Sequence, residues 1–222
     1  MKINLLQSLP KTWGKKPKKD INQRKNVSEK DRILSWRLDR EYFDGTRSQG
    51  YAGYRYDGRW KSVAVDIIKH YNLKDDAKIL DIGCAKGFLL DEFGKILKKP
   101  ILCGLDISSY AVSKAYKKPL KYMCVGNATQ LPYESKYFDL VLSINSLHNI
   151  LNQKNLELAF KEINRVTKKN MYVTLGSYKS NKAKKILDEW AVVASAYMKE
   201  KSWMKFFKKI NYRGDFWWFE PK

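Results

Sequence analysis

Apolar residues between positions 78 and 175 occur in short runs that are separated by segments of helical spacing. The runs Lys78–Ile82 (KILDI), Ile101–Asp106 (ILCGLD) and Phe138–Ile144 (FDLVLSI) have the near-continuous hydrophobicity of strands buried in a parallel sheet. Two further runs, Lys121–Val125 and Met171–Leu175, continue the series. This alternation predicts an α/β fold built on a doubly wound, mostly parallel sheet of six to seven strands.

Helical segments flank this core and lie between its strands. Ser28 is typical of a helix N-cap, with Asp31 in the first turn, and the helix that it begins extends to about Tyr42. Further helices are predicted at Ser62–Tyr71, Leu156–Val166, Lys182–Met198 and Ser202–Ile210. Gly214–Glu220 is the one clear candidate for a closing strand, so we expect that edge of the sheet to be short or irregular.

A turn rich in small residues, Gly83–Gly87, follows the first core strand and precedes a helical segment. Such a turn leaves backbone N–H groups of the helix N-terminus free to contact a ligand. Asp106 ends the next strand about 20 residues later, where a carboxylate accepts hydrogen bonds from ribose hydroxyls. The dinucleotide fingerprint G-x-G-x-x-G is absent, because Ala85 and Phe88 stand at its second and third glycine positions. The ligand is therefore expected to be a nucleoside without a pyrophosphate.

Three segments in this region resemble motifs of class I S-adenosylmethionine (SAM) methyltransferases. Asp81–Gly87 has the form D-x-G-x-x-x-G, and Gly126–Tyr133 (GNATQLPY) is similar to the family's G-D-A-x-x-L-P-F segment. The run at 138–144 resembles the family's fourth strand and is followed by NSLH at 145–148. The resemblance covers roughly residues 77–177 and implies the Rossmann-like methyltransferase fold, with SAM as methyl donor and S-adenosyl-L-homocysteine (SAH) as product.

The resemblance also implies a set of cofactor contacts. They are Asp81, Gly83, Cys84 and Gly87 at the methionine end, Asp106 and Ile107 at the ribose, Asn127 and Ala128 at the adenine, and Ser143 and Ile144 near the methyl group. The family usually has glycine where Ala85 stands and often has aspartate where Asn127 stands. An amide both donates and accepts hydrogen bonds, so we expect adenine binding to survive the second difference.

The loop at 45–60 combines glycine, tyrosine, arginine and tryptophan, as binding loops do. We predict that it closes over the cofactor, with Tyr56 and Arg59 contacting SAM. The acceptor side of the site is expected to include Tyr54, Trp60, Asn145 and Trp217. The alternative is that these aromatic residues pack the preceding helix against the domain.

His148 is the strongest candidate for a general base, because it follows the fourth strand at the ligand-binding rim of the sheet. A base is needed only when the nucleophile carries a proton that must leave. The alternative is that His148 orients a loop.

Composition indicates one globular domain of 222 residues with 44% hydrophobic content. We divide the chain into a basic flexible arm (1–27), N-terminal helices with an aromatic lid loop (28–71) and a SAM-binding domain (72–222).

There is no apolar run long enough to span a membrane, and the first ten residues lack the order of a signal peptide. Three cysteines without a C-x-x-C pair predict neither a metal site nor a disulfide framework, and a cytoplasmic location is expected.

The net charge of +21 has two interpretations. A basic surface attracts RNA phosphates without sequence contacts. However, the basic residues are 35 Lys and only 9 Arg, whereas arginine is preferred for bidentate phosphate recognition. We therefore favour a lysine-biased composition and predict methyl transfer to O or N of a small-molecule acceptor, such as a sugar or other metabolite. An RNA methyltransferase and a non-catalytic SAM-binding partner subunit remain the alternatives, and the sequence leaves the acceptor and the oligomeric state open.

Overall fold

The computed structural model describes residues 1–9, 27–116, 123–193 and 195–219 of the chain. The strands are β1 (Lys78–Ile82), β2 (Ile101–Asp106), β3 (Met123–Val125), β4 (Phe138–Ile144), β5 (Thr167–Tyr178), β6 (Met198–Lys199) and β7 (Asp215–Phe219). The α-helices are α2 (Glu29–Trp36), α3 (Arg40–Asp44), α4 (Trp60–Tyr71), α5 (Phe88–Ile96), α6 (Ser109–Ser113), α7 (Gln153–Val166), α8 (Asn181–Trp190) and α9 (Glu200–Lys209), and η1 (Leu147–Asn149) is a 3-10 turn.

The strands form one seven-stranded sheet in the order β3-β2-β1-β4-β5, with β6 and β7 both pairing to β5. Every pair of neighbouring strands in this sheet is parallel, from β1 beside β2 to β5 beside β7. The strand order reverses direction between β1 and β4, which is where doubly wound sheets open a crevice for a ligand. The predicted doubly wound α/β fold is therefore confirmed.

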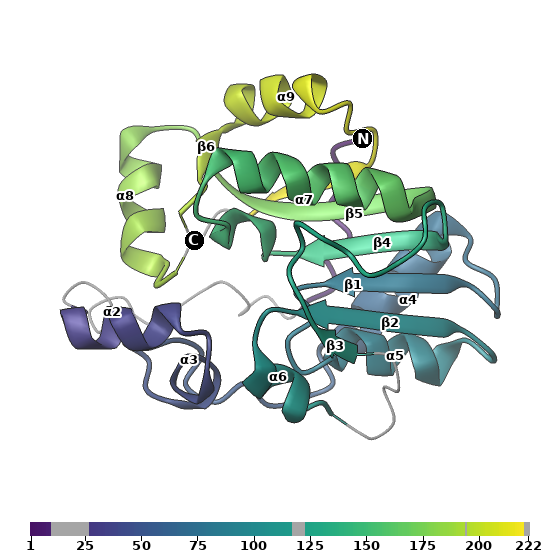
Figure 1. The fold of residues 1–222 in the computed structure, drawn as a ribbon, viewed down its shortest axis with the longest axis horizontal. Helices are drawn as coiled ribbons and strands as arrows, with labels where there is room; N and C mark the ends of the chain where they lie inside the picture. The colour runs from purple at the N-terminus through teal and green to yellow at the C-terminus, as the bar shows by residue number, and fades with distance from the viewer. Residues whose placement is uncertain (10–26, 117–122, 194, 220–222) are drawn as a thin grey trace.

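Helices cover both faces of the sheet (Figure 1). On one face, α7 and α9 contribute Leu156, Phe160, Trp203 and Phe206 to the larger apolar core. On the other face, α4 and α5 pack with Leu5, Leu6 and Leu9 from the start of the chain. Because both faces of the central strands are covered, those strands are apolar almost throughout, which explains why the sequence predicted them well.

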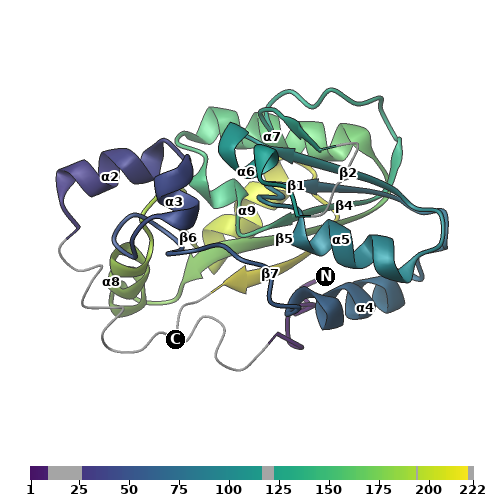
Figure 2. The ribbon, with the colours of Figure 1, turned by 90° about the horizontal axis from the view of Figure 1, so that it is seen from below.

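The edge of the sheet beyond β5 is short and irregular, as the single clear candidate for a closing strand predicted. Here β6 has only two residues, and β7 runs parallel to β5, with Tyr172 opposite Asp215. The first residues of the chain extend this edge, since Ile3 N donates to Phe216 O (2.9 Å) and Phe216 N donates to Met1 O (2.9 Å). Figure 2 shows the N-terminus beside β7 and α4.

The first nine residues of the predicted arm are docked on the domain. Leu5, Leu6 and Leu9 are buried, so residues 1–9 are packed against the domain. The remainder of the predicted arm, residues 10–26, lies outside the described residues.

Two predicted helices are shorter than expected. The helix capped by Ser28, whose side chain accepts from Asp31 N, ends at Trp36, because Leu38 takes a positive φ of 52° before α3 begins. The helix predicted at Lys182–Met198 ends at Trp190, and the chain then leads to β6. Within the described ranges, no helix combines the length and the apolar character that a membrane crossing needs.

Candidate functional site

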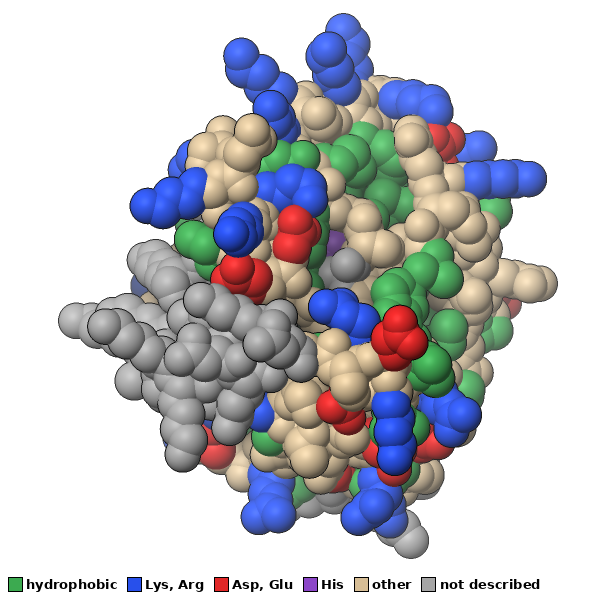
Figure 3. Space-filling view, turned by 90° about the vertical axis from the view of Figure 1, so that its left-hand side faces the viewer, with side chains coloured by type: hydrophobic (Ala, Val, Ile, Leu, Met, Phe, Trp, Pro, Cys, Tyr) green, Lys and Arg blue, Asp and Glu red, His purple; other side chains and the backbone are tan. Residues whose placement is uncertain are grey.

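A cavity of about 920 Å³ lies at the carboxyl end of the sheet. One wall is formed by the ends of β1, β2 and β4, and the opposite wall by α2, α3, the loop before α4 and the end of α8. Figure 3 faces this side of the molecule, where the surface is hollowed and Lys and Arg side chains stand around the hollow. Ligand sites of doubly wound sheets occur at this position.

Asp106 links the first two strand ends within this wall. Its Oδ2 accepts from Ala85 N (2.8 Å) and its Oδ1 accepts from Ser108 N (2.9 Å). The carboxyl group is 8% exposed, and this burial raises its pKa, although both backbone N–H groups oppose the shift. Each oxygen retains a lone pair, so the carboxylate is fixed in orientation and still able to accept hydrogen bonds from a ligand.

The turn after β1 approaches the end of β4 very closely. Gly83 has a positive φ of 78°, and a Cβ built there would lie 2.0 Å from Ser146 Oγ. Ala85 also adopts the left-handed region, with φ of 51°, so alanine keeps the backbone conformation that glycine would favour at this position.

Asp81 lies behind this turn without lining the cavity. Its carboxyl group is 5% exposed and makes no hydrogen bond among the described residues. Burial, together with the nearby Asp106, raises the pKa of Asp81 to about 7. The Asp81 charge contributes to raising the pKa of Tyr54, after the larger effect of burial, so the two side chains lie close together.

The segments after β2 and β3 contribute an apolar side chain and an amide. Ile107 lines the cavity with 57% of its surface exposed, although isoleucine is usually buried. Asn127 Oδ1 accepts from Thr129 N (3.0 Å), and Asn127 and Ala128 both line the cavity. An exposed apolar surface beside an amide is suited to a flat heteroaromatic ring.

The end of β4 is held by β5. Asn145, with a positive φ of 53°, donates its backbone N–H to Thr174 Oγ1 (2.8 Å) and accepts from the same hydroxyl at Oδ1 (2.8 Å). Ser143 is fully buried and donates to Ile82 O (2.9 Å). Ile144 and Asn145 line the cavity, whereas Ser143 supports β1 from behind.

His148 lies in η1 and is tied to two other segments. Its Nδ1 accepts from Gly176 N on β5 (3.0 Å), and its backbone carbonyl accepts from Ser195 N and Ala196 N. The side chain lines the cavity but is only 3% exposed, and burial lowers its pKa to about 4.

This hydrogen bond argues against the general-base role predicted for His148. A neutral imidazole that accepts at Nδ1 carries its proton on Nε2, so neither nitrogen has a lone pair to receive another proton. The geometry makes His148 a hydrogen-bond donor, and its Nε2 has no partner in the part of the chain that the structure describes.

Three arginines line the lid side of the cavity and differ in their hydrogen-bond partners. Arg47 donates to the carbonyl oxygens of Gly50 (3.0 Å) and Tyr51 (3.2 Å), and Arg59 pairs with Asp57 (Nε to Oδ2, 2.6 Å). Arg55 is exposed and lines the cavity, with no hydrogen bond or ion pair to any described residue.

The lid is attached to the glycine turn by an ion pair between buried Lys86 and half-buried Asp44. Lys86 Nζ lies 2.7 Å from Asp44 Oδ2, and Lys86 is 7% exposed. Asp44 also accepts from Tyr110 OH (2.7 Å) and Tyr54 N (3.0 Å). Burial alone would raise the pKa of Asp44, but the hydrogen bonds from Lys86 and Tyr110 outweigh it and lower the pKa. The ring of Tyr54 stacks on Phe88 at the start of α5 (4.9 Å between centroids).

The structure thus brings most of the predicted site residues to one cavity. Those that line it are Gly83, Asp106, Ile107, Asn127, Ala128, Ile144, Asn145, His148, Tyr54, Arg59 and Trp60. Four others lie directly behind the lining or within the turn: Asp81, Cys84, Gly87 and Ser143.

Two predicted residues lie elsewhere. The Tyr56 hydroxyl donates to Glu92 on α5, and its ring stacks on Tyr116 (4.3 Å), so Tyr56 fastens the loop to the domain. Trp217 is partly buried and packs against the apolar core on the α4 side, and Lys2 Nζ lies 5.7 Å from the centroid of its ring.

Sequence reasoning missed several lining residues, among them Tyr42, Tyr51, Arg55, Trp190 and Tyr197. Arg55 belongs to the loop that was predicted to bind, but no local signal separates it from its neighbours Tyr54 and Tyr56. Trp190 and Tyr197 were both predicted to lie in the helix at 182–198. In the structure α8 ends at Trp190, and both residues line the cavity.

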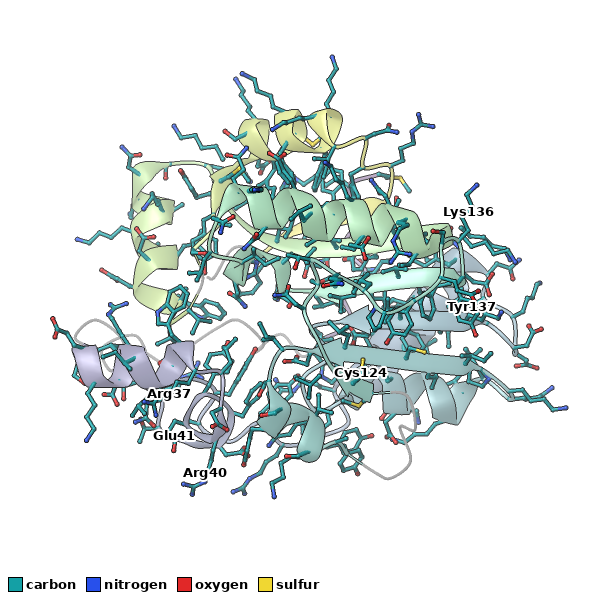
Figure 4. All side chains as sticks on the ribbon, viewed as in Figure 1. Arg37, Arg40, Glu41, Cys124, Lys136 and Tyr137 are labelled. Atoms are coloured by element: carbon teal, nitrogen blue, oxygen red, sulfur yellow. The ribbon has the colours of Figure 1, made fainter. Side chains whose placement is uncertain are left out.

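Within the described ranges, no group of three or more His, Cys, Asp or Glu side chains is arranged to hold a metal ion. All three cysteines are unpaired, and Cys124, labelled in Figure 4, lies near Tyr133 OH (3.6 Å).

Comparison with known families matches residues 80–175 to the model of a methyltransferase domain, which confirms the resemblance found in the sequence. The chain is 35% identical over 133 residues to the uncharacterized protein MJ1252 of Methanocaldococcus jannaschii, covering 58% of this chain and 47% of that protein. It is 33% identical over 106 residues to malonyl-[acyl-carrier protein] O-methyltransferase of Legionella pneumophila, covering 45% and 36%. A tRNA (carboxymethyluridine(34)-5-O)-methyltransferase of Arabidopsis thaliana matches at 24% identity over 151 residues, covering 64% and 33%. The chain therefore spans less than half the length of these curated relatives.

Solved structures show the same fold at low sequence identity. One is a chain from the complex between the Haloferax volcanii Trm112 methyltransferase activator and a methyltransferase (TM-score 0.54, 18% identity, covering 70% of this chain and 77% of that chain). Another is the YcgJ protein of Bacillus subtilis (TM-score 0.52, 17% identity, covering 66% of each chain).

Proposed function

We propose that the protein is a class I SAM-dependent methyltransferase that transfers a methyl group from SAM to an oxygen or nitrogen atom of a small-molecule acceptor, since residues 80–175 match the model of a methyltransferase domain. The observation that carries the proposal is a single cavity that joins the strand ends to the lid. SAM supplies an electrophilic methyl group attached to a sulfonium sulfur.

The strand-end residues fit this donor. Asp106 is a fixed carboxylate with free lone pairs for the ribose hydroxyls, and exposed Ile107 with Asn127 suits the adenine. The tight backbone approach at Gly83 suits the methionine end, and Asp81 lies directly behind this turn. Ile144 and Asn145 line the space between these parts and the lid.

The remaining space is suited to a small acceptor. The cavity volume of about 920 Å³ lies near the top of the range of roughly 300–1,000 Å³ that is usual for small-molecule sites, which leaves room for an acceptor beside SAM. Within residues 28–71, the part up to the start of α4 serves as a lid, since Tyr54, Arg59 and Trp60 line the cavity and Asp44 binds the glycine turn through Lys86. Three unpaired cysteines support the reducing cytoplasm as the location.

Two relatives support oxygen as the acceptor atom, because both are O-methyltransferases by name. One of them acts on tRNA, and this chain has a net charge of +21, so an RNA methyltransferase is the second candidate function. The activator complex among the structural relatives supports a third arrangement, in which a protein partner is required or this chain serves as a SAM-binding subunit.

The test begins with SAM and SAH binding by calorimetry to the full chain and to the Asp106→Ala variant. We expect binding by the wild type and at least a tenfold loss in the variant, roughly the value of one charge-assisted hydrogen bond. Methyl-labelled SAM is then incubated with the protein and either a small-metabolite extract or total RNA. Label in metabolites supports the proposal, label in RNA supports the second candidate, and SAM binding without transfer to either supports the non-catalytic subunit.

A further inference from the structure

We propose that the acceptor atom is a carboxylate oxygen and that the product is a methyl ester. This inference rests on the proposed function and names its substrate class. Two features of the cavity point to it: the described lining residues offer donors and one uncommitted cation, and they offer no free proton acceptor suited to activating a neutral nucleophile.

The histidine of the cavity is committed as a donor. Gly176 N–H occupies the Nδ1 lone pair of His148, and burial keeps the ring neutral, so the remaining proton is on Nε2. An Nε2–H group binds an oxygen that already carries negative charge better than it binds a protonated hydroxyl or amine.

The two carboxylates that line the cavity are committed as well. Asp57 is paired with Arg59, and this hydrogen bond lowers the pKa of the Asp57 carboxyl, which makes it a weak base. Asp106 accepts from two backbone N–H groups and faces the proposed ribose position. Tyrosines also line the cavity, but phenols titrate near pH 10, and burial raises the pKa of Tyr54 well above that value.

The basic lining residues are all arginine. The chain has 35 Lys and 9 Arg, yet the described cations that line the cavity are Arg47, Arg55 and Arg59. Arginine binds a carboxylate through two parallel N–H···O bonds, which a lysine does not. Arg47 is engaged with backbone carbonyls and Arg59 with Asp57, so Arg55 is the lining cation that has no partner among the described residues.

A carboxylate acceptor removes the need for a base. Carboxyl groups ionise near pH 4, so the nucleophile is already deprotonated at neutral pH. One carboxylate oxygen donates an electron pair to form the new O–CH₃ bond, while the C–S bond breaks and its electron pair stays on sulfur. The sulfonium becomes the neutral thioether SAH, the carboxylate becomes a neutral ester, and no proton is released. Arg55 and the His148 Nε2–H would hold and orient the acceptor.

The experiment examines the bond that is formed. The full chain is incubated with methyl-labelled SAM and, in separate arms, a small-metabolite extract or total RNA, and the labelled products are treated with alkali. Methyl esters release volatile labelled methanol, whereas N-methyl groups and methyl ethers are stable. Alkali-labile label in metabolites supports the inference. Alkali-labile label in RNA supports a carboxylate acceptor and overturns the small-molecule part of the proposed function.

Alkali-stable label in either arm overturns the inference and leaves methyl transfer intact. Absence of transfer in both arms overturns the proposed function and, with it, the inference. Alkali-stable label shows that methyl transfer occurs, whereas absence of label shows that it does not. The failure of the inference and the failure of the proposed function are therefore distinguishable.

Variants give an independent readout. Arg55→Ala is expected to raise the acceptor KM about tenfold or more while the calorimetric Kd for SAH stays unchanged. Arg40→Ala is the matched control, because Arg40 lies on the outer side of α3 and its side chain extends away from the sheet (Figure 4). Equal KM effects in the two variants would contradict the assignment.

The pH profile tests the donor role of His148. With a carboxylate acceptor, neither the nucleophile nor His148 contributes a titration to kcat between about pH 6 and about pH 9. The pKa of Asp81 is raised to about 7 by burial, so any pH dependence in this interval is expected to come from Asp81 and to be the same in the wild type and the His148 variants. His148→Gln, which keeps a side-chain N–H, should retain more activity than His148→Ala. A rise of kcat with pH that both variants abolish would show a base and overturn the inference.

Discussion

Replacing Asp81 by asparagine should remove a pH-dependent loss of stability. The pKa of this buried carboxyl is raised from 3.8 to about 7 by burial and by Asp106, so the folded protein disfavours the charged form. Between these two values the folded state binds more protons than the unfolded state, and stability therefore falls as pH rises. The full shift corresponds to about 4 kcal/mol, with about 3 kcal/mol of it lost between pH 5 and pH 8.

The assay is urea unfolding of wild type and Asp81→Asn at pH 5 and pH 8. The quantity compared is the change in unfolding free energy with pH, wild type minus variant, because other groups contribute equally to both proteins. We expect the wild type to lose about 3 kcal/mol more than the variant over this interval. Asp75→Asn is the matched control, because its side chain is 51% exposed, and it should leave the wild-type pH dependence in place. Parallel pH dependence in wild type and Asp81→Asn would refute the reasoning.

Three further predictions concern the lid, the turn and the buried histidine. Removing Asp44 should destabilise the protein by about 3 kcal/mol, because the buried charge of Lys86 loses its partner. A double-mutant cycle of Asp44 and Lys86 in urea should show coupling, and additive effects would contradict a stabilising ion pair. Gly83→Ala should lower stability and SAM affinity more than Gly58→Ala. Both glycines have a similar positive φ, but only at Gly83 does the added methyl group clash with a neighbour. Equal losses in the two variants would mean that backbone strain, and not the clash, lowers the stability. His148→Ala should cost about 2 kcal/mol at pH 7 by leaving a buried N–H unpaired. Burial lowers the pKa of this histidine in the folded protein to about 4, so the wild type should lose stability as pH falls from about 6.5 to about 4. The same loss of stability in His148→Ala would contradict a buried, neutral His148.

Prediction from sequence succeeded where local pattern decides structure. The strands Lys78–Ile82, Ile101–Asp106 and Phe138–Ile144 were found with their observed ends, because they are covered on both faces and are apolar throughout. The helix expected at 182–198 was too long, since its apolar spacing continues past Trp190 while the real chain leaves the helix to reach β6.

The order of motifs also determined much of the site. In a parallel sheet the carboxyl ends of the strands meet at one edge, so Asp106, Asn127 and Asn145 share a cavity once the strand order is known. The resemblance over residues 77–177 implied a doubly wound parallel sheet, and the strand order of the structure confirms it.

The amino-acid sequence by itself therefore determined the doubly wound parallel sheet and the class of donor. Tertiary structure alone decided which neighbouring side chains face the cavity, since Arg55 lines it while Tyr56 fastens to α5. It also decided that His148 is a donor, because the proton on its ring is placed by Gly176, 28 positions away on β5. Directions of side chains in loops and the sharing of protons depend on contacts between distant segments, and no local pattern of residues encodes those contacts.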